Sequence, residues 1–405
     1  MILFLVVLCA ICLLSLTILF PRPATLLWLL ALATSPDAWA DRLAGTAQHE
    51  TIIALLKAFG LVILAALTLR HGLKRDRYNP AFAFITIFLT GLMHGLYPGL
   101  SLLSSTRSLI GSASPFLFSF TRLPDDFRRT VIGAVLWGPL CAVGFNIFLT
   151  AAGLDHMYVF EQGALRLGAT GQPPFLAGFA LIGVYAALLE TVSAPRRAAA
   201  AALAVNFAII LLTGARAPLA IACLDILALL ILQRRLVPLA GAGAMLAAAT
   251  LFSSWLGFIR IITLTQLGEA ANLSHRNIVW PYFQQAFWSS PIFGWGVGAG
   301  KVIIPVTSRL NTELGTNAAH NEYLRLGAEG GLFGLTLLIA LIILWVRRGT
   351  AAMPAAQRWL TCLIFISFAV HSATDNTMIA TTSSTFFLWA SCIFATAENR
   401  SKPAA

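Results

Sequence analysis

The chain is dominated by long apolar runs that alternate with short loops, and this pattern limits the folds open to it. A helix that crosses the hydrocarbon core of a bilayer needs about 20 predominantly apolar residues. The pattern therefore predicts an all-α fold, a polytopic transmembrane helical bundle of about 12 spans. The apolar runs lie near residues 2–19, 24–36, 52–69, 81–97, 101–119, 131–151, 174–191, 198–213, 217–232, 236–255, 321–346, 356–373 and 379–396. The weakest are 24–36, which is short, and 101–119, which is rich in Ser, Gly and Pro.

The composition excludes several classes of protein. Of the 405 residues, 58% are hydrophobic and 11% are charged, whereas about a quarter of an ordinary soluble domain is charged. A chain with so few polar side chains is neither a soluble enzyme nor a disordered protein. The six cysteines all lie within apolar runs, so we expect neither a disulfide framework nor a zinc site. The first run lacks a preceding basic segment and is too long for a signal peptide, so we expect a first span.

Basic residues fall in short clusters between the apolar runs and contribute to a net charge of +11. Cytoplasmic loops of membrane proteins are enriched in Lys and Arg, so this pattern favours membrane topology over nucleic-acid binding. Because the clusters occur in alternate loops, we assign these loops to the cytoplasm. They comprise Arg70, Lys74, Arg75 and Arg77; Arg122, Arg128 and Arg129; Arg196 and Arg197; Arg234 and Arg235; Arg347 and Arg348; and Arg400 and Lys402. The opposite loops, which then face the exterior or the periplasm, are 37–51, 152–173, 214–216, 256–320 and 371–378.

One outward loop is much longer than the others and divides the chain into three parts. Residues 1–255 hold about nine or ten expected spans, residues 256–320 form the large loop, and residues 321–405 hold the last spans and a cytoplasmic tail. Loops of this length are usually functional or disordered. This loop is too rich in aromatic residues for disorder, so we expect it to be folded and functional.

The large loop contains a segment with helical periodicity, followed by a glycine-rich segment. We expect a helix over about 276–289, with the apolar residues Ile278, Tyr282 and Phe283 on one side. Glycines at alternate positions of 294–300 predict a tight turn in which backbone approaches a ligand or a helix. This turn lacks the preceding strand and the following Lys-Ser/Thr pair of a phosphate-binding loop, so we expect no nucleotide cofactor.

Charged residues on the outward side are the main candidates for chemistry, because a charge at membrane depth is costly. Arg216 is the clearest, since only the turn 213–215 separates two apolar runs there. Its guanidinium would suit pyrophosphate oxygens, and it would equally reach lipid phosphate as an interfacial anchor. Arg166 and Arg276 are each consistent with an exposed loop charge. Together with Arg216 they would form a cationic pocket.

His320 is a candidate general base, because imidazole accepts a proton near neutral pH. It is equally consistent with a histidine that caps the helix expected to follow it. Glu322 and Asp375 would orient the imidazole or cap helices, and His371 is a further candidate deeper in its apolar run. The outward loops contain no HExxH motif, no Asp-x-Asp pair and no carboxylate cluster, which argues against metal-dependent chemistry.

Three motifs, in order along the chain, resemble the shared signature of bacterial O-antigen ligases and O-antigen polymerases. They are an Arg-x-x-x-Trp helix, a Pro-x-x-Gly-x-Gly turn, and a His-Asn-x-x-Leu segment that leads to Gly-x-x-Gly. The resemblance covers about 60 residues directly, and the large outward loop before the last spans extends it to most of the chain. The matching residues are Arg276 and Trp280; Pro291, Gly294 and Gly296; and His320, Asn321, Leu324, Gly331 and Gly334.

The resemblance implies a multi-pass glycosyltransferase of the Gram-negative inner membrane, with its active site facing the periplasm. Such a ligase takes a glycan from undecaprenyl pyrophosphate and joins it to a sugar hydroxyl of lipid A–core. It needs no metal or other cofactor, because pyrophosphate is the leaving group. The resemblance makes His320 the base and assigns pyrophosphate to Arg216 and Arg276, with Arg166 as a looser match. The further substrate-binding residues would be Trp280, Gly294, Gly296, Asn321, Glu322 and Asp375.

Two other functions stay open at this point. An O-antigen polymerase would use the same site to extend the glycan on its carrier. A polysaccharide-lipid transporter or flippase would also have about a dozen spans, but it would favour broken helices near the midplane and two related halves. The sequence instead gathers its outward charges at one face, which favours an enzyme.

Overall fold

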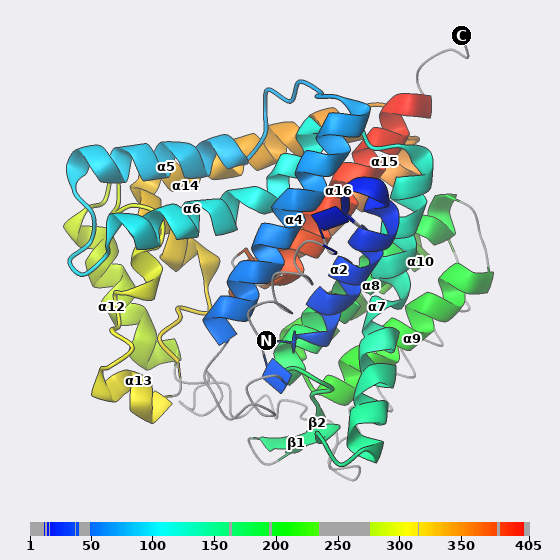
Figure 1. Ribbon diagram of the computed structural model, residues 1–405, viewed down its shortest axis with the longest axis horizontal. Helices are drawn as coiled ribbons and strands as arrows, with labels where there is room; N and C mark the ends of the chain where they lie inside the picture. The colour runs from blue at the N-terminus through cyan, green and yellow to red at the C-terminus, as the bar shows by residue number, and fades with distance from the viewer. Residues whose placement is uncertain are drawn as a thin grey trace.

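The described part of the chain is a bundle of helices with one small β-hairpin, seen in a computed structural model (Figure 1). The structure describes residues 12, 14, 15, 17–36, 38, 39, 49–161, 164–193, 197–234, 276–314, 316–378 and 381–400. The α-helices are α2 (Pro21–Thr34), α4 (His49–His71), α5 (Ala81–His94), α6 (Leu102–Leu117), α7 (Asp125–Ala151), α8 (Pro173–Ser193), α9 (Arg197–Thr213), α10 (Arg216–Leu232), α12 (Arg276–Ser289), α13 (Arg309–Leu314), α14 (Glu322–Thr350), α15 (Ala355–Ser372) and α16 (Thr381–Arg400). Short 3-10 turns lie at η1 (Phe118–Phe120) and η4 (Ala299–Lys301), and strands β1 (Tyr158–Glu161) and β2 (Ala164–Leu167) pair antiparallel. The predicted all-α fold is confirmed.

The apolar runs correspond closely to helices. Within the described ranges, four helices are long and apolar enough to cross a membrane: Thr51–His71, Asp125–Ala151, Pro173–Ser193 and Glu322–Thr350. The two weakest runs also form helices, α2 and α6. The run at 236–255 and most of the run at 2–19 lie outside the described residues. The total of about 12 spans therefore stays a prediction.

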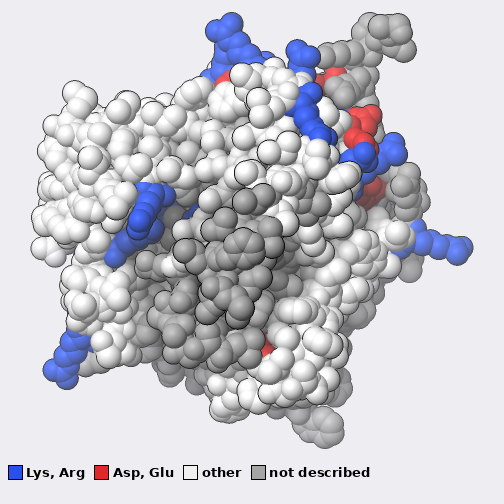
Figure 2. All heavy atoms as spheres, viewed as in Figure 1, with Lys and Arg blue, Asp and Glu red and all other residues white. Residues whose placement is uncertain are grey.

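Several basic clusters meet at one end of the bundle. The backbone at Leu73 pairs with Thr121, which joins the loops after α4 and before α7. The Lys74 ammonium lies 2.6 Å from the carboxylate of Glu398 near the end of α16. In Figure 2, Lys and Arg gather mainly along the upper and right-hand edges, with further basic groups at the left and a largely uncharged body between them. Loops that the sequence assigns to one side thus lie together, although the compartment stays a prediction.

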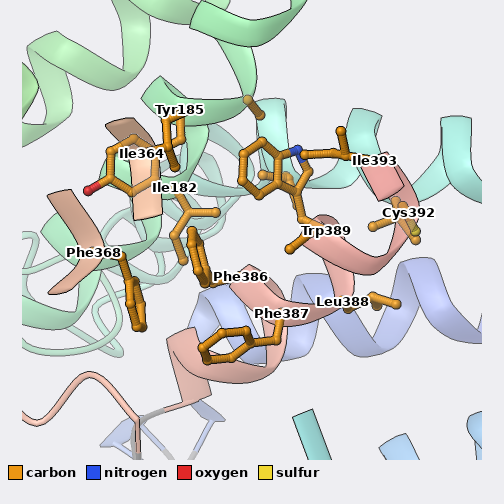
Figure 3. Packing of buried hydrophobic residues seen from close by; sticks show 14 of the residues in the cluster. Ile182, Tyr185, Ile364, Phe368, Phe386, Phe387, Leu388, Trp389, Cys392 and Ile393 are labelled. Atoms are coloured by element: carbon orange, nitrogen blue, oxygen red, sulfur yellow. The ribbon is translucent and has the colours of Figure 1, made fainter. Parts of the chain in front are cut away.

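The core is centred on α16, which packs against α7, α6, α8 and α14. Figure 3 shows Phe386 of this helix close to Ile182 of α8 and Phe368 of α15. The rings of Phe386 and Phe368 are stacked, with centroids 4.2 Å apart. The next residue, Phe387, lies against Phe116 of α6 with centroids 4.1 Å apart. Interlocked aromatic rings of this kind hold the helices in fixed positions.

Helix α14 is interrupted at Gly331, where the segment that follows α12 docks onto it. Gly331 has a φ of +59°, which glycine adopts without strain. At this break the N–H of Leu332 donates to the Pro291 carbonyl at 2.8 Å, and the N–H of Phe333 donates to the Ile292 carbonyl at 3.0 Å. The loop segment after α12 is therefore hydrogen-bonded to the core helix that follows His320.

The expected helix over 276–289 is confirmed as α12, and of its three apolar residues expected on one side, Phe283 is the buried one. Val279, Phe283 and Ala286 are buried, and α12 packs on α14 through this side. Ile278 and Tyr282 are instead 39% and 45% exposed. Val279, Phe283 and Ala286 are spaced by four and three residues and therefore share one face of the helix, and this face packs on α14.

Candidate functional site

His320 lies just before α14, and three side chains surround its imidazole. Its Nδ1 lies 3.5 Å from Oδ1 of Asp375 and 3.4 Å from Nδ2 of Asn376. Its Nε2 lies 3.2 Å from the hydroxyl of Thr316. The backbone φ of His320 is +47°, a left-handed conformation that is strained for a residue with a side chain and is concentrated at functional sites. About a third of each side chain of the His320–Asp375 pair is exposed, so a substrate can reach it.

The carboxylate of Asp375 faces Nδ1 of His320. In the tautomer with the proton on Nδ1, the imidazole donates to the Asp375 carboxylate and Nε2 keeps its lone pair. Burial would raise the pKa of Asp375, but the hydrogen bond from His320, the neighbouring His371 and the N–H of Asn376 together lower it. An ionised Asp375 therefore holds the ring from one side. A base held by a third group is a recurring arrangement in enzymes that activate a nucleophile.

Arg276 and Trp280, one turn apart on α12, tie this helix to the segments around the imidazole. Nη2 of Arg276 donates to the Thr374 carbonyl at 2.5 Å, and Nε1 of Trp280 donates to the Ala319 carbonyl at 2.9 Å. Nε of Arg276 is buried and has no hydrogen-bond partner among the described residues. Burial lowers the pKa of Arg276, and the charge of Asp375 opposes this effect. The guanidinium therefore keeps one buried N–H that an anionic ligand entering beside α12 would pair.

A buried ion network lies behind the histidine. The Glu322 carboxylate accepts the N–H of Met378 at 2.9 Å and a hydrogen bond from Nε of Arg325 at 2.6 Å. The same guanidinium donates to Glu329 at 2.8 Å, and Glu329 also accepts the N–H of Gly300 at 3.3 Å. All three charged side chains are at most 5% exposed. The network joins α14 to the loop after α15 and to the glycine-rich turn, so Glu322 supports the site from behind and does not contact the imidazole by any recorded hydrogen bond.

We expect Arg325→Met to destabilise the protein by about 3–5 kcal/mol, because it leaves two buried carboxylates without their shared partner. The free energy of unfolding is measured in detergent by chemical denaturation, followed through tryptophan fluorescence. Arg129→Met is the matched control, because Arg129 is exposed. Equal stability of the two variants would contradict the structural role of the network.

The helix cap at the start of α14 is Asn321. Its side-chain oxygen accepts the N–H groups of Tyr323 at 3.0 Å and Leu324 at 3.2 Å. An N-cap of this kind satisfies backbone donors that the first turn cannot pair internally. The alternative that His320 caps this helix is therefore wrong. Its imidazole instead contacts Thr316, Asp375 and Asn376.

The glycine-rich turn packs against two helices. The N–H groups of Trp295 and Gly296 donate to the carbonyls of Ala328 and Glu329 at 3.0 and 2.8 Å. Gly294 has a φ of +67°, and a Cβ there would lie 2.5 Å from the backbone of Glu329. On α5, a Cβ at Gly91 would lie 2.5 Å from the Cα of Gly296. The expected tight turn is confirmed, with helices as the approaching partners.

We expect Gly294→Ala to destabilise the protein by about 1–3 kcal/mol, since alanine is strained at positive φ and its Cβ would overlap the backbone of α14. Gly133→Ala on α7 is the control, because its Cβ would meet nothing within 4 Å and alanine favours the helix. Melting temperatures in the same detergent compare the two. A Gly294→Ala protein as stable as the Gly133→Ala protein would show that α14 yields easily at this contact.

Arg166 and Arg216 lie together in a second part of the site. Arg166 stands opposite Val159 in the β-hairpin and is 7% exposed. Its Nε donates at 2.8 Å to the carbonyl of Thr213, which ends α9. Arg216 follows three residues later as the first residue of α10, and it is half-buried. The hairpin therefore places one arginine directly on the turn that carries the other.

A buried hydrogen bond joins α10, which begins at Arg216, to α15, which ends shortly before Asp375. The hydroxyl of Ser367 donates to Asp225 at 2.6 Å and joins the two helices. Arg216 precedes Asp225 by nine residues, which is about 14 Å of helix, while Asp375 follows Ser367 by eight residues. No group of three or more His, Cys, Asp or Glu side chains that could hold a metal ion occurs in the described ranges.

One comparison matches part of the chain to a known family. A family model described as O-antigen ligase matches residues 199–339, which include Arg216, α12, the glycine-rich turn and His320. Residues 199–339 therefore carry a segment of the O-antigen ligase family. Members of this family are membrane enzymes of the glycosyltransferase type, ligases and polymerases, and their substrates are lipid-linked glycans. No curated protein matches the chain.

Some residues around the imidazole lie outside the segment that matches the O-antigen ligase family. Asp375, Asn376 and His371 lie beyond the matched segment, yet they surround or adjoin the imidazole. Asn376 and Thr316 are not expected from any motif. Arg325 and Glu329 are also not predicted. The sequence does contain a signal for them, because Glu322, Arg325 and Glu329 are spaced by three and four residues within an apolar run, as paired charges on one helix face are.

Proposed function

We propose that the chain is an O-antigen ligase that transfers a glycan from undecaprenyl pyrophosphate to a sugar hydroxyl of lipid A–core. In this proposal the protein lies in the inner membrane of a Gram-negative cell and acts at the periplasmic face without a metal. The spans within 1–255 and 321–405 then flank the periplasmic loop 256–320, which contributes α12. The family match and the His320 cluster support the proposal.

His320 is the general base in this reaction. The acceptor hydroxyl gives its proton to Nε2 while its oxygen attacks the anomeric carbon of the donor sugar. The bond between that carbon and the pyrophosphate oxygen breaks, and the electron pair leaves with undecaprenyl pyrophosphate. A single displacement inverts the anomeric carbon. Asp375 stabilises the imidazolium that forms, through its contact with Nδ1.

The arginines stabilise the leaving group. Arg276 is bound to the Thr374 carbonyl next to Asp375, and Arg216 carries a half-buried guanidinium at the start of α10. Both would bind pyrophosphate oxygens as their negative charge grows during bond breaking. Arg166 holds the turn before Arg216 through Thr213 and adds positive charge. Trp280, Asn321, Glu322, Gly294 and Gly296 support the positions of these groups in the site.

The observation that carries the proposal is the contact of His320 with Asp375, with Arg276 bound to the adjoining Thr374. A base, its orienting acid and an anion-binding group thus converge from three segments far apart in the sequence. A transporter has no need for such a group at one end of the bundle. This arrangement favours glycosyl transfer.

Complementation separates ligase from polymerase. The chain is expressed in one strain that lacks its O-antigen ligase and in another that lacks its O-antigen polymerase, and lipopolysaccharide is separated on a gel. Restoration of the ladder only in the ligase-deficient strain is the expected result. Restoration of long chains only in the polymerase-deficient strain would keep the site and assign the other acceptor.

A further inference from the structure

A groove of about 730 Å³ lies between α14 and α15. Its walls are apolar over most of their length and include Leu338, Ile342 and Val346 of α14 and Phe365 of α15. One end reaches Glu322 and Met378, and the other reaches the turn between the two helices. The groove is open to the side, because its rim includes exposed isoleucines: Ile339, Ile343 and Ile366 are 39%, 59% and 61% exposed.

Two arginines stand at the end of the groove that lies by the α14–α15 turn. Arg347 comes from the last turn of α14 and Arg358 from the first turn of α15, and both are exposed. Neither side chain has an acidic partner among the described residues. Their guanidinium groups therefore place uncompensated positive charge where an otherwise apolar groove ends. Basic pockets between membrane helices bind the headgroups of anionic lipids.

The dimensions suit one leaflet of a bilayer. The hydrocarbon core is about 30 Å thick, so the acyl chains of one leaflet extend about 15 Å. At a rise of 1.5 Å per residue this corresponds to about ten residues of α14, from Arg347 back to about Leu338. This stretch of α14 lines the groove. A lipid with its headgroup at the arginines would therefore fill the half of the groove farther from His320.

We propose that this half of the groove binds an anionic phospholipid, with its phosphate between Arg347 and Arg358 and its acyl chains along α14 toward Leu338. The charge at this end selects the headgroup. A lipid-linked donor whose pyrophosphate lay near His320 would place only its hydrocarbon tail here and would leave both arginines without an anion. The lipid site stands apart from the glycosyl-transfer chemistry and does not depend on it.

Native mass spectrometry of the full, delipidated chain tests the proposal. The protein is titrated with phosphatidylglycerol and with phosphatidylcholine that carry the same acyl chains. We expect the anionic lipid to bind about 30-fold more tightly, given two arginines near the headgroup. The double variant Arg347→Gln/Arg358→Gln should bind the two lipids equally, and the control Arg129→Gln should keep the full preference.

A second variant tests the groove itself. Cys362→Trp places a large ring among the groove-lining residues and leaves both arginines intact, so it should strongly reduce binding of phosphatidylglycerol. Equal binding of the two lipids by the unaltered chain would overturn the proposal, as would an undiminished preference in the double variant or full binding by Cys362→Trp. Undecaprenyl phosphate that binds more tightly than phosphatidylglycerol, with or without the two arginines, would assign the groove to the donor tail and would also overturn it.

Discussion

His320→Ala should lower the rate of glycan transfer by about 10²–10⁴-fold, the range that a positioned general base contributes. The variant keeps the donor and acceptor sites but has no group to take the hydroxyl proton. The imidazole makes only long contacts with Thr316, Asp375 and Asn376, so its removal should leave the fold intact. The rate is measured with purified protein, lipid-linked donor and lipid A–core.

His156→Ala is the matched control for this experiment. His156 is exposed in the outward loop before β1, and its side chain has no role in the proposed site. It should transfer glycan at the unaltered rate. Transfer by His320→Ala at the rate of this control would remove the base assignment, provided that both proteins elute as folded species in size-exclusion chromatography.

Arg216→Ala should lower the transfer rate by about 10²–10³-fold, the usual effect of removing one group that stabilises developing negative charge. Arg216→Lys should recover only part of the loss, because an ammonium is a point charge and cannot bind two oxygens as a planar guanidinium does. The two variants are compared by single-turnover release of undecaprenyl pyrophosphate, which reports on the leaving group directly.

Arg309→Gln provides the control for charge alone. Arg309 begins α13 in the large loop and is exposed, so the variant loses one positive charge within the loop that contains α12. It should release undecaprenyl pyrophosphate at the unaltered rate. If Arg216→Ala matches this control, Arg216 does not bind pyrophosphate, and its role is that of an interfacial anchor for lipid.

The helices could be predicted because apolar runs in a membrane-type chain leave few alternatives. Even the two weak runs, 24–36 and 101–119, form helices. The buried face of α12 could not be predicted from its own apolar residues. Ile278 and Val279 are adjacent on the helix, and only the position of α14 decides which one is buried.

The site could be predicted in part, because its groups come from separate segments. His320 and Arg276 were recognisable from motifs, but their contacts with the 374–376 loop depend on how α14 and α15 pack. The Arg325 network could not be predicted, because Arg325 and Glu329 lie within a run that is expected to be a membrane span. Their hydrogen bonds can be recognised only in the folded structure. The positive φ of His320 likewise has no signal in the sequence.

Reconstituted transfer tests the central claim most directly. The purified chain is incubated in proteoliposomes with undecaprenyl pyrophosphate-linked glycan and lipid A–core, and the products are analysed by mass spectrometry. The account predicts glycan joined to lipid A–core, release of undecaprenyl pyrophosphate in equal amount, and loss of both products in His320→Ala. Longer glycans that stay on the carrier, with lipid A–core unchanged, would contradict it.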